Sequence, residues 1–83
     1  MTQEGIYEGL KKVIERNLPR NGRSISLLMD TNLDQLGIDS ARRIDILLDA
    51  EDMFGIVIEE SAFAAVSTLR DLVNLVGELA LAA

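Results

Sequence analysis

Aliphatic residues recur every three or four positions in three separate segments of this 83-residue chain, and this spacing constrains the fold most. It places the aliphatic side chains on one face of a helix. The first segment predicts a helix over Gln3–Asn17, which ends before Pro19 because the residue preceding a proline prefers extended backbone. Its predicted apolar stripe consists of Ile6, Leu10, Val13 and Ile14.

The second segment predicts a helix over Ser40–Phe54, with Asp39 as its N-cap and Gly55 as its stop. Its predicted inward face consists of Ala41, Ile44, Leu47, Leu48 and Phe54. A short third helix over Glu59–Ala65 is expected to be anchored by Phe63 and Val66. A last helix, capped by Ser67 or Thr68, carries the stripe Leu69, Leu72, Val73, Val76 and Leu79 and precedes a loose tail, Leu81–Ala83.

The segments between these helices lack a helical or strand period. The long connection over Arg20–Asp39 contains scattered aliphatics that we expect to pin it across the helices: Ile25, Leu27, Leu28, Leu33, Leu36 and Ile38. The β-branched run Ile56–Ile58 has no second strand to pair with, so it predicts an extended connector. The sequence therefore predicts an all-α fold, a small antiparallel four-helix bundle with three longer helices, a short third helix and a long loop between the first two. Residues 1–83 form a single predicted domain.

The composition excludes several kinds of chemistry. The chain contains no histidine and no cysteine, so no side chain supplies a neutral-pH base or a thiolate, and an intrinsic enzyme is disfavoured. The net charge of −6 disfavours nucleic acid as a partner and favours basic surfaces of other proteins, although solubility alone also explains it. We expect a cytoplasmic location and no membrane partner, because neither a signal peptide nor an apolar segment of spanning length is present. We also expect a monomer.

The run over residues 30–40 reads D-x-x-L-x-x-L-G-x-D-S and leads directly into the second predicted helix. Taken alone, Asp39-Ser40 is typical of a helix cap. The opening Asp30-x-Asn32-x-Asp34 also matches the start of a calcium-binding EF-hand loop. Such a loop needs glycine at its sixth position and glutamate at its twelfth, where this chain has Gln35 and Ala41. We therefore predict no metal site.

The whole run resembles the attachment motif of the acyl carrier protein family, and the resemblance extends over most of the chain. The order of the predicted helices and the positions of Gly37, Asp39, Ser40, Phe54 and Ile58 match those of the family. The resemblance implies that Ser40 carries 4'-phosphopantetheine from coenzyme A, with Asp39 and Gly37 shaping the site. It further implies a non-catalytic carrier, modified by a phosphopantetheinyl transferase, whose acyl thioesters pass between acyltransferase- and ketosynthase-type enzymes. A phosphate on Ser40 would suit the N-terminus of a helix.

Charged residues on the second predicted helix suggest a docking surface: Arg42, Arg43, Asp45, Asp49 and Asp52. A solvated helix face explains the same residues, but the resemblance implies that this helix is the main recognition element. Ala41 stands where the family usually has a large aliphatic residue, and Arg42 where an acidic residue is often found. These departures favour a specialised carrier of a polyketide or other secondary pathway over the fatty acid carrier. A peptidyl carrier and a helical interaction module, in which Ser40 is only a cap, are the alternatives.

A pocket for the acyl chain is a further expectation. The apolar residues that could line it inside the bundle are Ile44, Leu48, Phe54, Ile58, Phe63 and Leu69. Packing in the hydrophobic core explains each of these residues equally well.

Overall fold

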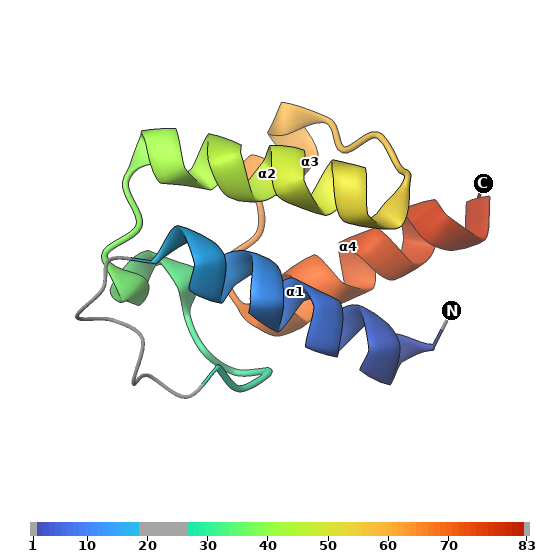
Figure 1. Cartoon of the computed structure of the whole chain (residues 1–83), viewed down its shortest axis with the longest axis horizontal. Coiled ribbons are helices and arrows are strands. Elements are labelled where there is room, and N and C mark those ends of the chain that lie inside the picture. The colour runs from blue at the N-terminus through green and yellow to red at the C-terminus, as the bar shows by residue number, and fades with distance from the viewer. Residues whose placement is uncertain (1, 19–26, 83) are drawn as a thin grey trace.

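The computed structural model describes residues 2–18 and 27–82. Across these residues the chain forms four α-helices and one 3-10 helix: α1 (Gln3–Asn17), η2 (Leu33–Leu36), α2 (Ser40–Phe54), α3 (Glu60–Ala64) and α4 (Leu69–Ala82). Helix α1 packs against both α2 and α4 and runs in the opposite direction from each (Figure 1). The predicted all-α antiparallel bundle with a short third helix is confirmed.

Helix α1 has the predicted bounds and the predicted buried face. It begins after Thr2, whose Oγ1 accepts a hydrogen bond from the Gly5 N–H at 3.0 Å. It ends at Asn17, and its C-cap Leu18 has the extended backbone expected of a residue before proline (φ −83°, ψ 150°). The buried residues of α1 are the predicted stripe: Ile6, Leu10, Val13 and Ile14.

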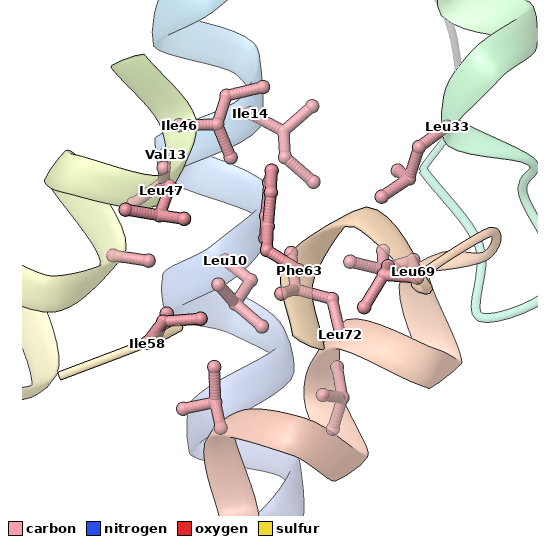
Figure 2. Packing of buried hydrophobic residues seen from close by; sticks show 14 of the residues in the cluster. Leu10, Val13, Ile14, Leu33, Ile46, Leu47, Ile58, Phe63, Leu69 and Leu72 are labelled. Atoms are coloured by element: carbon pink, nitrogen blue, oxygen red, sulfur yellow. The ribbon is translucent and has the colours of Figure 1, made fainter. Parts of the chain in front are cut away.

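The hydrophobic core draws side chains from every helix. Phe63 of α3 lies at its centre, among side chains from α1 and α4 (Figure 2). No polar side chain is buried in the part of the chain that the structure describes. The buried Phe63 holds the short helix α3 in place, as predicted, together with the buried Val66 that follows the helix.

The predicted inward face of α2 is wrong for three of its residues. The buried residues of the helix are Ile46, Leu47 and Ala50, whereas Ala41 is exposed, Ile44 is 41% exposed and Leu48 is 54% exposed. Aliphatics at both 44/48 and 46/50 satisfy helical spacing, so the pattern allowed two rotations of the helix about its axis. Packing against α1 selects the second.

The described part of the long connection is pinned as predicted, with one exception. Leu27, Leu33 and Leu36 are buried, and Ile38 packs against the core. Leu28 is 61% exposed, contrary to the prediction, because it lies in a turn closed by the Thr31 N–H bond to the Leu28 carbonyl. Ile25 lies outside the described residues.

The same connection is joined to the start of α4 by an isolated antiparallel bridge between Asn32 and Thr68. The Leu33 N–H donates to the Ser67 carbonyl at 2.8 Å, and the Leu69 N–H donates to the Thr31 carbonyl at 3.0 Å. These bonds hold η2 against the linker between α3 and α4.

The connector before α3 has the predicted structure, whereas the bounds of α3 and α4 differ slightly from those predicted. Ile56 and Ile58 are buried in an extended connector, with Val57 exposed between them. The α3 helix begins one residue later than predicted, at Glu60, because Glu59 is its N-cap. Helix α4 continues to Ala82, so the loose tail predicted from Leu81 is wrong up to that residue.

Thr68 rather than Ser67 caps α4. The Thr68 Oγ1 accepts from the Asp71 N–H at 3.2 Å, and the Asp71 carboxylate accepts from the N–H groups of Thr68 and Ser67 at 3.1 Å each. This reciprocal arrangement is a capping box. The two backbone bonds stabilise the charged carboxylate and lower the pKa of Asp71. Among the described helices, none is both long and apolar enough to cross a membrane.

Candidate functional site

Ser40 is the first residue of α2 and is exposed to solvent. Asp39, the N-cap, has extended backbone, and its Oδ1 accepts from the Arg42 N–H at 2.8 Å. The Asp39 carbonyl accepts from the Arg43 N–H at 2.9 Å. The cap fixes where the helix starts, so it fixes the hydroxyl of Ser40 at the helix N-terminus. The first N–H groups there have no acceptor within the helix, which favours an anion.

Gly37 makes the turn that leads from η2 into α2. Its backbone is left-handed, with φ 73° and ψ 26°, a region in which only glycine is unstrained. A Cβ at this position would meet no atom within 4 Å, so conformation rather than space requires the glycine. The turn follows the buried Leu36, which anchors η2 in the core.

A cleft of about 410 Å³ opens beside Ser40, between α2 and α3. The residues that line it are Ser40, Arg43, Ile44, Leu47, Glu60, Ser61, Phe63 and Ala64. Its wall toward the core is apolar, and its charged groups come from Arg43 and Glu60. The exposed hydroxyl therefore stands at the edge of a mostly apolar recess.

Arg43 forms one wall of this cleft and contacts two other elements. Its Nη1 donates to the Asp34 carboxylate at 2.7 Å, and its Nη2 donates to the carbonyls of Phe63 and Val66 at 3.4 and 3.3 Å. The guanidinium also lies 5.3 Å from the centre of the Phe63 ring, within range of a cation–π contact. Arg43 thus joins η2, α2 and the end of α3.

Comparison with known proteins identifies the family. The sequence model described as "Phosphopantetheine attachment site" matches residues 8–76, which include this whole site. The chain belongs to the acyl carrier protein family. It is 30% identical over 76 residues to an acyl carrier protein of Exiguobacterium sibiricum, covering 92% of this chain and 95% of the relative. It is 29% identical over 79 residues to one of Petrotoga mobilis, covering 94% of this chain and 91% of the relative.

A third relative, "Acyl carrier protein 3" of Ralstonia nicotianae, is 30% identical over 82 residues, which is 99% of this chain and 92% of the relative. Members of this family are non-catalytic carriers whose prosthetic group is 4'-phosphopantetheine. As a member, the chain is a carrier rather than a catalyst, and members of the family interact in general with a phosphopantetheinyl transferase and with biosynthetic enzymes. These relatives do not distinguish a fatty acid pathway from a polyketide pathway.

The residues that the sequence suggested for an acyl pocket in this carrier divide between the cleft, the core and the surface. Ile44 and Phe63 line the cleft beside Ser40. Ile58 and Leu69 are buried in the same core cluster as Phe63 but do not line the cleft, Phe54 is half-buried, and Leu48 is 54% exposed. Sequence reasoning missed Leu47 and Ala64, because helical periodicity alone does not show which part of α3 faces α2.

The five charged residues suggested for docking also divide into two groups. Arg42 and Asp49 both bind Asn17 at the end of α1: the Arg42 guanidinium donates to its carbonyl, and the Asn17 amide donates to the Asp49 carboxylate, each at 2.9 Å. Arg43 is only 20% exposed. Asp45 and Asp52 are exposed on α2, and neither side chain forms a hydrogen bond to another described residue.

The oxygen-bearing side chains of the EF-hand-like run are engaged separately. Asp30 pairs with Arg70, Asp34 pairs with Arg43, and the Asn32 Oδ1 accepts from the Asp34 N–H. Their oxygens therefore bind three separate protein groups: the guanidinium of Arg70, the guanidinium of Arg43 and the N–H of Asp34. Within the described residues, no cluster of acidic side chains is arranged to hold a metal ion.

Proposed function

We propose that Ser40 carries the 4'-phosphopantetheine arm of this carrier as a phosphodiester, and that residues 1–83 act as a single acyl carrier domain. The observation that supports this assignment is that Ser40, the first residue of α2, is exposed and lies within the segment that matches the family. The Ser40 oxygen forms a bond to the pantetheine-side phosphorus of coenzyme A as the P–O bond of the pyrophosphate breaks, adenosine 3',5'-bisphosphate leaves, and the hydroxyl proton passes to a base of the transferase. The thiol at the far end of the arm then holds an acyl group as a thioester.

The transferase must supply the base for this reaction. The sequence has no histidine, and the arginine beside Ser40 stays protonated. Asp39 accepts a bond from the Arg42 N–H, and no side-chain hydrogen bond joins Ser40 to Asp39 or Glu60. Ser40 is therefore a substrate, not an activated nucleophile. The helix N-terminus, together with the turn at Gly37 and the cap at Asp39, contributes by positioning the hydroxyl and by favouring the phosphate once it is attached.

The cleft between α2 and α3 is the proposed resting place for the acyl chain. Its apolar lining by Ile44, Leu47, Phe63 and Ala64 begins at Ser40, so an attached arm reaches it without crossing the bundle. This assignment retains Ile44 and Phe63 from the residues suggested by the sequence. Ile58 and Leu69 are not assigned to the acyl site, because they are buried in the core and do not line the cleft.

The proposed docking face is the exposed side of α2, defined by Ile44, Leu48, Asp45 and Asp52. Two large apolar side chains beside two carboxylates fit a partner surface with an apolar depression and a basic rim. The transferase and enzymes of acyltransferase and ketosynthase type are the proposed partners. Arg42 adds a positive charge near this face, which supports a specialised, polyketide or other secondary pathway. The monomeric state and cytoplasmic location stay predictions.

Intact-mass measurement after incubation with coenzyme A and a promiscuous phosphopantetheinyl transferase tests the attachment site. We expect one phosphopantetheine adduct on the natural chain and none on Ser40→Ala. Ser61→Ala is the matched control, because Ser61 lines the same cleft but lies on α3, and its adduct should persist. An adduct on folded Ser40→Ala would refute the assignment, and no adduct on the natural chain would favour an interaction module in which Ser40 is only a cap.

A further inference from the structure

Helix α3 forms one side of the cleft but has few means of holding its own position. It contains five residues, and its N-cap Glu59 makes no side-chain capping bond. A helix of five residues is unstable by itself in water, because it has too few further hydrogen bonds to offset the free-energy cost of forming its first turn. Its placement therefore depends on contacts with the rest of the protein. Those contacts include the buried Phe63, the buried Val66 that follows the helix, and the guanidinium of Arg43.

We propose that Arg43 is a positioning residue that latches α3 onto α2 and η2, and thereby sets how far the cleft beside Ser40 opens. The proposal rests on the proposed function of that cleft as the acyl site. Arg43 comes one helical turn after Ser40, and both residues line the cleft. A displacement of the Arg43 guanidinium therefore changes the wall of the cleft next to the proposed phosphopantetheine arm.

The contacts of Arg43 differ in strength. The bond to Asp34 at 2.7 Å is short and joins opposite charges, so it is the strongest. The bonds to the carbonyls of Phe63 and Val66, at 3.4 and 3.3 Å, are long and individually weak. They place positive charge at the carboxyl end of α3, where it is favoured. The cation–π contact with Phe63 adds to them.

The latch can open because its anchor lies at the surface. The Asp34 side chain is 67% exposed, whereas that of Arg43 is 20% exposed. Water and salt compete for an exposed carboxylate, so the pair breaks at small cost. Arg42 provides a contrast one residue earlier, because its guanidinium binds the end of α1 and does not reach α3.

Amide hydrogen exchange on the unmodified protein gives the first test, with Arg43→Ala compared to Arg42→Ala. We expect Arg43→Ala to accelerate exchange at the amides of Phe63 and Val66 about tenfold relative to Leu10 and Leu72, the factor given by about 1.4 kcal/mol. Arg42→Ala should leave this ratio unchanged. An equal acceleration at all four amides, or none, would overturn the proposal, because it would show only a general loss of stability.

Two further variants keep the test decisive if Arg43→Ala does not fold. Asp34→Asn removes the anchor and retains the arginine, so it should accelerate exchange in α3 selectively but by a smaller factor. Arg43→Lys keeps the charge near Asp34 but not the planar group that reaches the carbonyls, so it should rescue only part of the effect. Full rescue by lysine would overturn the assignment of the carbonyl and ring contacts.

The second test uses a solvent-sensitive fluorophore attached to Ser40 through a pantetheine analogue. We expect Arg43→Ala to shift the emission toward that of an apolar environment, because an unlatched α3 admits more of the probe, and Arg42→Ala to leave it unchanged. Unchanged emission in Arg43→Ala would overturn the link between the latch and the cleft. Failure of the label to attach would contradict the proposed function instead, while the exchange measurements, which need no arm, would still decide whether the latch exists.

Discussion

Leu47 and Leu48 are neighbours in α2 that face opposite environments, so alanine substitutions at the two positions test the orientation of this helix. Leu47 is 5% exposed, whereas Leu48 is 54% exposed. Truncation of a buried leucine costs about 2–5 kcal/mol, because a cavity adds to the lost burial. Full burial of a leucine contributes about 1.5–3 kcal/mol, so the half of Leu48 that is covered makes Leu48→Ala cost about 1 kcal/mol.

These costs are large for so small a protein. A chain of this length has a total stability of about 4–12 kcal/mol, so Leu47→Ala removes a substantial part of it. Each kcal/mol shifts the midpoint of thermal unfolding by about 4–8 °C in a domain of this size. Urea and thermal unfolding followed by circular dichroism should therefore show a loss at Leu47→Ala at least about twice that at Leu48→Ala.

Modification kinetics should rank the same two variants in the opposite order. Leu48 belongs to the proposed docking face, so Leu48→Ala should lower kcat/KM of the phosphopantetheinyl transferase about fivefold or more, as truncation of an interface anchor does. Leu47→Ala, assayed at a temperature at which it is folded, should lower kcat/KM less than Leu48→Ala does, because Leu47 is 5% exposed and is not part of the proposed docking face. Equal losses of stability in the two variants would refute the orientation of α2 described above.

Two other predictions concern close packing and pH. Gly9→Ala should be less stable than Gly77→Ala by about 1–3 kcal/mol in urea unfolding, because overpacking opposes the gain in helix propensity that both share. A Cβ at Gly9 would lie 2.9 Å from the Phe54 ring, whereas one at Gly77 would meet its nearest neighbour at 3.7 Å; equal stabilities would contradict the close approach of α1 and α2. The lowered pKa of Asp71 means that its carboxylate adds stability above its ordinary pKa of 3.8, and this stability is lost as pH falls through the lower folded value. Urea unfolding across pH should therefore show that Asp71→Asn loses less unfolding free energy than the natural chain as the pH falls from neutral through the folded pKa of Asp71. An identical pH dependence in the natural chain and Asp71→Asn would contradict this prediction.

Local signals in the sequence were enough to predict the helices and the start of the site. Pro19 and Gly55 mark where α1 and α2 end, and Asp39 marks where α2 begins. The same short motif contains Gly37, whose backbone is left-handed in the structure, and Ser40, which is exposed. Each of these features depends on residues only a few positions apart.

Features that depend on tertiary contacts could not be predicted in this way. The rotation of α2 was ambiguous, because Ile44 and Leu48 match helical spacing as well as Ile46 and Ala50 do. The contacts of Arg43 could not be predicted, because nothing near it in the sequence indicates that its guanidinium meets Asp34 and the end of α3. The lining of the cleft was predicted only in part for the same reason, since it needs the relative placement of two helices.

The bridge between Asn32 and Thr68 bears on when the attachment site becomes competent during synthesis. It ties the segment that leads into α2 to the segment that leads into α4, and these segments lie far apart along the chain. Pairings between distant segments are slow to form, because the intervening chain must first be closed into a loop. We expect the backbone around Ser40 to be disordered in a nascent chain that still lacks α4. The phosphopantetheine arm would then be attached only to molecules that have finished folding.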